Sequence, residues 1–206
     1  MPFTAKSGKF NASINAVEFG TGDKAVKIGG ENVFPLYSFD AAIENAPKVG
    51  IEITDFGMEH EPECIKKYYE GCATLADMAR KAASMEGVDF LSFRMEGGDP
   101  NGANKSTEEL IGELKEIADA VDLPLVVCGC KNVEKDAELF SKAAEALNGK
   151  NAVILSAKEE NYKTVGAAAG LAYKQVVGAE SAVDINLAKQ LNVLISQLGV
   201  DSKSVV

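Results

Sequence analysis

Cysteine and histidine, which often bind metals or act as nucleophiles and bases, are scarce in this sequence. The cysteines are Cys64, Cys72, Cys128 and Cys130, and His60 is the single histidine. Iron–sulfur clusters usually require four thiolates at CxxC-type spacing, and the CxC at 128–130 departs from that spacing. The pairs also do not match a Cys/His zinc site. We therefore expect no metal or iron–sulfur cluster in this chain, and catalysis by a Ser-His-Asp or Cys-His set would depend on His60 alone.

Acidic and amide side chains instead follow the apolar segments of the chain at regular intervals. These side chains, together with one thiol, are the candidate ligand-binding residues: Asp55, Asp99, Asn101, Cys130, Asn132, Asn161 and Asn186. Turn formation alone also explains the polar residues of GGDPNG (97–102), and helix capping explains Asn132 and Asp184. Cys128 is interpreted as a strand core residue, because a free cysteine packs as a small hydrophobe. Cys130 is the cysteine expected to face a ligand.

Together these side chains predict an uncharged-to-acidic mouth without the Lys and Arg clusters that phosphorylated substrates require. Gly-rich phosphate cradles are also absent from the sequence. Such a mouth suits a neutral or cationic polar heterocycle, for example a pterin or the amide-rimmed face of a corrinoid.

The elements that must position these residues alternate between strands and helices. A β-hairpin is expected near the N-terminus, with strands over 13–19 and 24–28. The later strands are expected at 49–54, 88–93, 124–128, 151–155, 175–178 and 204–206. Apolar residues at steps of three and four predict the intervening helices over 62–82, 107–121, 139–147, 162–173 and 184–198. The first of these helices would carry both Cys64 and Cys72.

This alternation predicts an α/β fold with a parallel sheet, because solid apolar strands are buried on both faces. Polar residues follow nearly every strand and no GxGxxG follows any, which favours a (β/α)8 TIM-type barrel over a doubly wound sheet. Residues 1–47 would form an N-terminal hairpin and cap, and residues 48–206 the barrel domain. About six of eight strands are present, so the barrel is expected to be incomplete at the C-terminus as given.

The charge balance restricts the class of partner. The 206 residues carry 21 Lys and Arg against 31 Asp and Glu, a formal net charge of −10. This acidity argues against a nucleic-acid binder and against docking on anionic membrane. No apolar run approaches the roughly 20 residues of a membrane span, and the N-terminus lacks an apolar signal segment. A soluble cytoplasmic protein is expected.

Several segments resemble a known family, the small (delta) subunit of the corrinoid iron–sulfur protein of the acetyl-CoA decarbonylase/synthase complex. The resemblance lies in GGDPNGAN (97–104), PLVVCGCKNVEKD (124–136), LSAKEENYK (155–163) and VDINLAKQLNVLI (183–195). The opening segments GGENVFPLYSFD (29–40) and VGIEITD (49–55) are similar as well. The family's chains continue beyond the point where this one stops.

The resemblance implies a TIM barrel in a heterodimer that carries a methyl group on the cobalt of a corrinoid (cobalamin). The methyl group would come from methyltetrahydrofolate or another methyltetrahydropterin through a methyltransferase. It would go to acetyl-CoA synthase/CO dehydrogenase in the reductive acetyl-CoA (Wood–Ljungdahl) pathway of carbon fixation in anaerobes. The large (gamma) subunit would hold the iron–sulfur cluster and most of the corrinoid, and this chain would be a non-catalytic subunit that helps to enclose it.

Two other functions remain open from the residues alone. The Asp- and Asn-rich mouth also suits a pterin-binding methyltransferase that acts directly on a corrinoid. A stand-alone aldolase or hydrolase is the third reading, since barrels support many chemistries. The absence of a strand-borne lysine counts against a Schiff-base mechanism, because Lys158 and Lys163 lie beyond the fourth strand.

Overall fold

The structure, a computed structural model, describes residues 14–31 and 43–206. Its larger sheet has five parallel strands in the order β3-β4-β5-β6-β7. The bounds of these strands are β3 Gly50–Thr54, β4 Phe90–Arg94, β5 Leu125–Cys128, β6 Val153–Ala157 and β7 Val176–Ala179. The predicted parallel α/β architecture is therefore confirmed, but in the described part of the chain the sheet does not close into a barrel.

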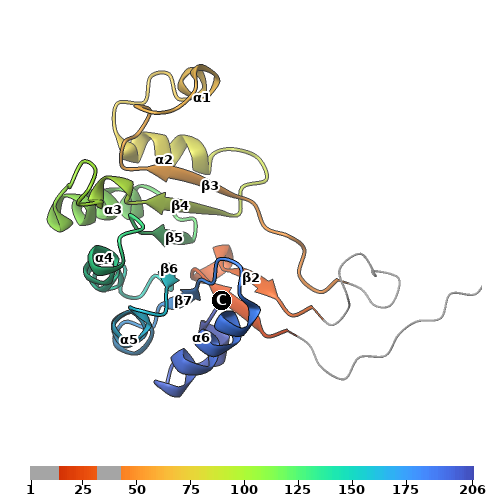
Figure 1. Ribbon diagram of the computed structural model, residues 1–206. Coiled ribbons are helices and arrows are strands. Elements are labelled where there is room, and N and C mark those ends of the chain that lie inside the picture. The colour runs from red at the N-terminus through yellow and green to blue at the C-terminus, as the bar shows by residue number, and fades with distance from the viewer. Residues whose placement is uncertain (1–13, 32–42) are drawn as a thin grey trace, which may run out of the picture.

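Helices connect consecutive strands and cover one face of the sheet (Figure 1). They are α1 Glu63–Tyr68, α2 Leu75–Ala83, α3 Thr107–Ala120, α4 Val133–Ala146, α5 Tyr162–Val165 and α6 Ile185–Gln197. A π-helical segment, η3 Gly166–Ala172, continues α5. Short 3-10 turns lie at η1 Gly22–Lys24, η2 Glu96–Gly98 and η4 Ser202–Ser204. The helical segment expected over 162–173 is thus present, partly in π form.

The single helix expected over 62–82 is wrong, because the structure divides it into α1 and α2. Gly71 adopts a left-handed backbone (φ 87°) between them. A capping box then begins α2, in which the N–H of Asp77 donates to Thr74 Oγ1 (3.1 Å) and the N–H of Thr74 donates to Asp77 Oδ2 (3.1 Å). Cys72 lies in this break, so it does not share a helix with Cys64.

Strand alternation divides the apolar side chains between two cores. On the helix-covered face, Leu91, Phe93 and Val127 pack against buried residues of the helices, including Leu114 and Phe140. The face opposite the helices is called here the inward face. On it the strands present a second apolar cluster and, at their carboxyl ends, polar side chains. The inward face therefore holds the side chains available for a site.

The predicted hairpin is confirmed: β1 Ala16–Phe19 pairs antiparallel with β2 Val26–Gly29. Its Val17, Phe19 and Val26 pack against the inward-facing Val126, Val153 and Val176 of the sheet. At its turn, the N–H of Gly20 donates to Asn151 O (2.7 Å), just before β6 begins. The hairpin therefore fills the amino end of the inward face and leaves the carboxyl end open. Most of the 29–40 segment lies outside the described residues.

The last predicted strand, 204–206, is represented by a parallel bridge between Val205 and Val177. The N–H of Val206 donates to Val177 O (2.9 Å), and the N–H of Ala179 donates to Val206 O (2.7 Å). The segment thus extends the sheet beyond β7 in the same sequential order.

Candidate functional site

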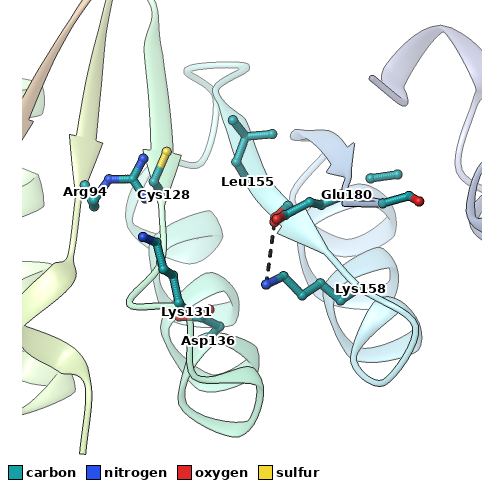
Figure 2. Close-up of a pocket in the computed structure, with 11 residues that line it drawn as sticks. Arg94, Cys128, Lys131, Asp136, Leu155, Lys158 and Glu180 are labelled. Atoms are coloured by element: carbon teal, nitrogen blue, oxygen red, sulfur yellow. Dashed lines mark hydrogen bonds and ion pairs between the residues drawn. The ribbon is translucent and has the colours of Figure 1, made fainter. Parts of the chain in front are cut away.

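A cavity of about 530 Å³ lies at the carboxyl ends of β4 to β7 (Figure 2). We call it the mouth cavity. Ligand sites of open parallel sheets and of barrels both lie at this edge, where the loops after the strands converge. Its lining residues are Arg94, Cys128, Gly129, Lys131, Asp136, Leu155, Ser156, Lys158, Ala179, Glu180 and Ser181.

Arg94, the last residue of β4, enters the cavity already paired with a carboxylate. Its Nε donates to Glu52 Oε1 (2.9 Å) and its Nη2 donates to Glu52 Oε2 (2.8 Å), a bidentate pair between neighbouring strands. The hydrogen bonds to Glu52 raise the pKa of Arg94 despite its partial burial. Nη1 makes no hydrogen bond with the described residues, so the guanidinium keeps donors for a ligand.

Cys128 lines the cavity and is 7% exposed, with its Sγ 3.5 Å from Ser92 Oγ. Burial raises the pKa of this thiol, and the Ser92 hydrogen bond and the Arg94 charge oppose the rise only in part. A neutral, buried thiol is a poor nucleophile. Cys128 therefore contributes a weakly polar surface to the cavity.

The β5–α4 loop is shaped by a buried carboxylate. Asp136 is 5% exposed, and its Oδ1 accepts from the N–H of Cys130 at 2.7 Å. Desolvation raises the pKa of Asp136, although the hydrogen bonds it accepts oppose the rise. A Cβ at Gly129 would lie 2.1 Å from Asp136 Oδ1, so only glycine fits there. Lys131 follows with a left-handed backbone (φ 70°).

On the far side of the cavity, Glu180 organises the ends of β6 and β7. Its Oε2 accepts a hydrogen bond from Ser156 Oγ and lies 3.6 Å from Lys158 Nζ. The cavity lining thus holds three cations, Arg94, Lys131 and Lys158, and two carboxylates. The expectation of an uncharged-to-acidic mouth is wrong, because the lining includes Arg94 from a strand end and Lys131 and Lys158 from two loops.

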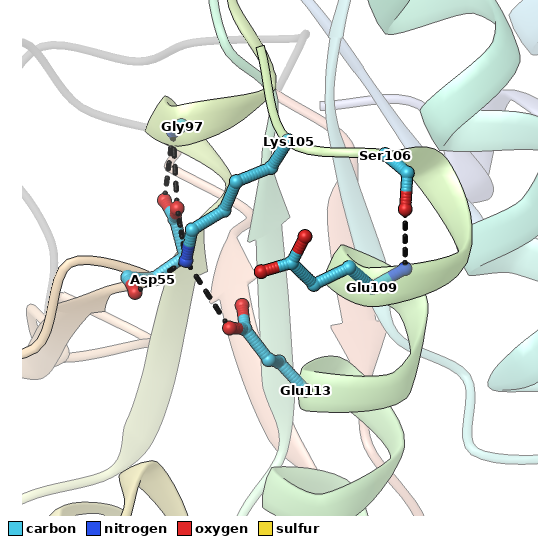
Figure 3. A network of polar contacts seen from close by, with 6 residues as sticks. All are labelled: Asp55, Gly97, Lys105, Ser106, Glu109 and Glu113. Carbon is cyan, nitrogen blue, oxygen red and sulfur yellow. Dashed lines mark hydrogen bonds and ion pairs between the residues drawn. The ribbon is translucent and has the colours of Figure 1, made fainter. Parts of the chain in front are cut away.

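Asp55, the first sequence-based candidate, is a buried anchor for the β4–α3 loop (Figure 3). Its two oxygens accept from the N–H of Gly97 at 2.9 and 3.1 Å, and Oδ2 lies 3.1 Å from Lys105 Nζ. Lys105 Nζ also donates to the backbone O of Asp55 (2.9 Å) and to Glu113 Oε1 (3.2 Å). Desolvation lowers the pKa of Lys105, but the hydrogen bonds to Asp55 and Glu113 and the charges of these carboxylates together raise it above its ordinary value. This arrangement fixes the loop at the mouth.

Asp99 and Asn101 lie together at the tip of that loop. Asp99 Oδ1 accepts from the N–H of Asn101 (3.0 Å) and from Asn101 Nδ2 (3.3 Å). The N–H of Gly102 donates to Asp99 O at 2.9 Å. These contacts are those of an Asx turn, which the sequence also allowed.

The remaining amide candidates lie directly before a helix or in its first turn. Asn132 caps α4 by accepting from the N–H of Lys135 (3.1 Å). Asn161, 4% exposed, accepts from the N–H of Lys158 (2.7 Å), and its Nδ2 has no hydrogen-bond partner among the described residues. Asn186 is exposed in the first turn of α6, which Asp184 caps as predicted.

Cys130 is 5% exposed in the helix-covered core, where burial raises the pKa of its thiol to about 11. The expected order of the two cysteines is therefore reversed: Cys128 faces the cavity and Cys130 does not. None of the seven candidates lines the mouth cavity. Their role in holding a cofactor stays a prediction.

Sequence reasoning missed the charged residues that do line the cavity, Arg94, Lys131, Lys158 and Glu180. One signal in the sequence was available for Arg94. It lies two residues after Ser92, so the two polar side chains share one face of the strand, and it is the last residue of that strand. The lysines carry no such periodic signal, since they lie in loops.

No three His, Cys, Asp or Glu side chains within residues 14–31 and 43–206 gather closely enough to hold a metal ion. Over the same ranges, no helix has the length and apolar character needed to cross a membrane.

Comparison with known proteins connects the chain to one family. Residues 16–206 match the family model described as CO dehydrogenase/acetyl-CoA synthase delta subunit. The chain belongs to this family. The match covers the hairpin, the sheet and the mouth cavity, so family membership extends to every element described above.

Curated relatives in the family are named acetyl-CoA decarbonylase/synthase complex subunit delta. The relative from Methanothermobacter thermautotrophicus is 30% identical over 200 residues, which cover 96% of this chain and 51% of the relative. The relative from Methanocaldococcus jannaschii is 30% identical over 206 residues, which cover 96% of this chain and 50% of the relative. The relative from Archaeoglobus fulgidus is 30% identical over 177 residues, which cover 84% of this chain and 38% of the relative. The chain spans about half the length of the first two relatives.

Proposed function

We propose that this chain forms part of the small subunit of a heterodimeric corrinoid iron–sulfur protein. The family match along residues 16–206 is the observation that carries the proposal. In this role the corrinoid cobalt carries a methyl group between a methyltetrahydropterin and acetyl-CoA synthase/CO dehydrogenase. The chain itself contributes enclosure and positioning in the cytoplasm, while a large subunit supplies the iron–sulfur cluster.

The sheet supports a (β/α)8 barrel as the complete fold. Its strands follow one another in sequence order, and Val205 continues that order next to β7. Sequential parallel strands with helices on one face are the arrangement of a barrel wall, whereas a doubly wound sheet reverses its order at a switch point. Residues 1–47 are proposed as the hairpin and cap, and residues 48–206 as barrel wall.

The mouth cavity fits part of a corrinoid by the chemistry of its donors. A corrin ring is rimmed by amide side chains, which need both hydrogen-bond donors and acceptors. The cavity offers N–H donors on Arg94, Lys131 and Lys158, and acceptors on Glu180 and Ser156. Its volume of about 530 Å³ is in the range that holds a drug-sized molecule, so a whole corrinoid would exceed it. This supports a cofactor shared with a partner subunit.

The direct pterin methyltransferase is the alternative, and the observed geometry weakens its motivation. It relied on free Asp and Asn side chains at the mouth. Asp55, Asp99 and Asn132 instead accept hydrogen bonds from backbone N–H groups.

Anaerobic co-purification with the large subunit tests the proposal. The expected result is a one-to-one complex that retains corrinoid, measured by intact mass and by visible absorbance. Cobalamin should bind weakly to this chain alone and strongly to the heterodimer. Equal affinity with and without the large subunit, or methyl transfer from methyltetrahydrofolate to cobalamin by this chain alone, would contradict the proposal.

A further inference from the structure

We propose that Arg94 and Glu52 together form a subsite for a neutral amide group. Arg94 would donate to the carbonyl oxygen of the amide, and Glu52 would disfavour a carboxylate in the same place. Arg94 reaches the mouth cavity from the end of β4, and Figure 2 shows its side chain extending toward Cys128 on β5. The identity of the ligand rests on the proposed function, because amide side chains surround a corrin ring.

Glu52 fixes the orientation of the Arg94 guanidinium. The two carboxylate oxygens accept from Nε at 2.9 Å and from Nη2 at 2.8 Å, so the plane of the guanidinium is held against β3. Nη1 has no hydrogen-bond partner among residues 14–31 and 43–206. The Arg94 side chain is 27% exposed, so water competes only in part for these free N–H groups. A donor that is held in place before binding loses little conformational entropy when a ligand arrives.

The polar side chains next to this pair have no donor left for a ligand. Ser92 Oγ donates to Glu52 Oε2 (3.4 Å) and lies 3.5 Å from Cys128 Sγ. Because a hydroxyl carries a single hydrogen, the thiol must be the donor in the second contact. The free hydrogens of this cluster of four residues therefore all belong to the guanidinium of Arg94.

The charges at the cavity balance, which favours a neutral ligand over an anion. With Glu52 counted as the partner of Arg94, three cations face three carboxylates: Arg94, Lys131, Lys158, Glu52, Asp136 and Glu180. A carboxylate bound at Arg94 would lie close to Glu52, and repulsion between the like charges would offset its attraction to the guanidinium. A neutral carbonyl oxygen accepts from Nη1 without this repulsion.

Corrinoid binding by the heterodimer tests the selectivity of the subsite. The two probes are cobinamide, whose ring carries amides, and cobyrinic acid, in which carboxylates replace those amides. Glu52→Gln removes the negative charge and leaves Arg94 as an uncompensated cation. We expect the preference for cobinamide over cobyrinic acid to fall at least about tenfold in this variant. A purely structural role of Glu52 would weaken both probes equally, so an unchanged preference would overturn the subsite.

Arg94→Lys tests the donor. Lysine retains the charge and can pair with Glu52, but it lacks the second planar nitrogen, so the affinity for cobinamide should fall about tenfold. The matched controls are Arg80→Lys and Glu145→Gln, which change exposed ion-pair residues of α2 and α4 outside the mouth cavity. Both controls should bind the two probes as the wild type does. Wild-type affinity for cobinamide in Arg94→Lys would also overturn the subsite.

Two further readouts separate the possible failures. Circular dichroism and intact mass show whether each variant is folded and forms the one-to-one complex. If the wild-type heterodimer binds neither corrinoid, the proposed function is overturned and the amide subsite with it. If the wild type binds cobinamide and the folded variants match it in affinity and preference, the subsite alone is overturned.

Discussion

Both carboxylate oxygens of Asp55 accept from the single N–H of Gly97, at 2.9 and 3.1 Å, across the space between β3 and the loop after β4. A Cβ on Gly97 would lie 2.2 Å from Asp55 Oδ2, so the contact requires glycine. Lys105 Nζ closes the same loop from its other end, 3.1 Å from Asp55 Oδ2. The shape of the mouth on this side therefore depends on one buried carboxylate.

Replacing that carboxylate should destabilise the fold. Asp55→Asn removes the negative charge that compensates Lys105, and the free energy of unfolding should fall by about 2–4 kcal/mol. Urea denaturation followed by circular dichroism measures the loss. Asp99→Asn, in the exposed turn of the same loop, is the control and should change the stability by less than about 1 kcal/mol. Equal effects of the two variants would show that Asp55 is not an anchor.

A side chain at Gly129 should destabilise the fold. Gly129→Ala places a Cβ 2.1 Å from Asp136 Oδ1 and 2.7 Å from Phe140, and overpacking of this kind costs about 1–3 kcal/mol. Gly112→Ala is the matched control, because no atom lies within 4 Å of its Cβ position in α3. That substitution should stabilise the protein by about 0.5–1 kcal/mol. A neutral Gly129→Ala would contradict the close approach of Asp136 to this loop.

The cysteines should differ sharply in their reactivity. Cys64 is exposed, whereas Cys128 and Cys130 are 7% and 5% exposed, and burial raises the pKa of both buried thiols. Iodoacetamide at pH 8 should therefore alkylate Cys64 in the native protein and leave Cys128 and Cys130 unmodified, as mass spectrometry can show. Rapid native alkylation of Cys128 would mean that its thiol is ionised and accessible.

The raised pKa of Cys130 also predicts a pH dependence of stability. The ordinary thiol value is 9.0 and the folded value is about 11, so above pH 9 the unfolded state loses a proton that the folded state keeps. The stabilisation is complete below about pH 9 and declines as the pH rises toward about 11, by at most about 1.4 kcal/mol per pH unit. Cys130→Ala should lose stability less steeply than wild type over that range. Parallel slopes would contradict the shift.

The sequence predicted the parallel strands and most helices because their signals are local. Solid apolar runs such as 124–128 have few alternatives to a buried strand, and Asp184 caps α6 where the pattern begins. The division between α1 and α2 was missed because the apolar stripe continues across it. A left-handed glycine and the Thr74 capping box, rather than the stripe, determine where α2 begins.

The site was harder to predict because it depends on where each strand ends. Cys128 and Cys130 are two residues apart and would share a face if β5 continued. The strand instead ends at Cys128, and Asp136 turns the next residues so that Cys130 enters the helix-covered core. The polar residues after the strands were identified, but whether each one faces a ligand or a backbone N–H depends on loop geometry that spacing does not encode.

A bulky side chain placed in the mouth cavity of the heterodimer tests most directly whether this cavity faces the corrinoid. Ser156→Phe fills space beside Glu180, and Thr164→Phe, on the exposed surface of α5, is the control. Visible absorbance after anaerobic co-purification with the large subunit measures the corrinoid retained per complex. We expect a large loss of corrinoid in Ser156→Phe, with the one-to-one complex intact, and full retention in Thr164→Phe. Full retention in both variants would contradict the claim that this cavity faces the corrinoid.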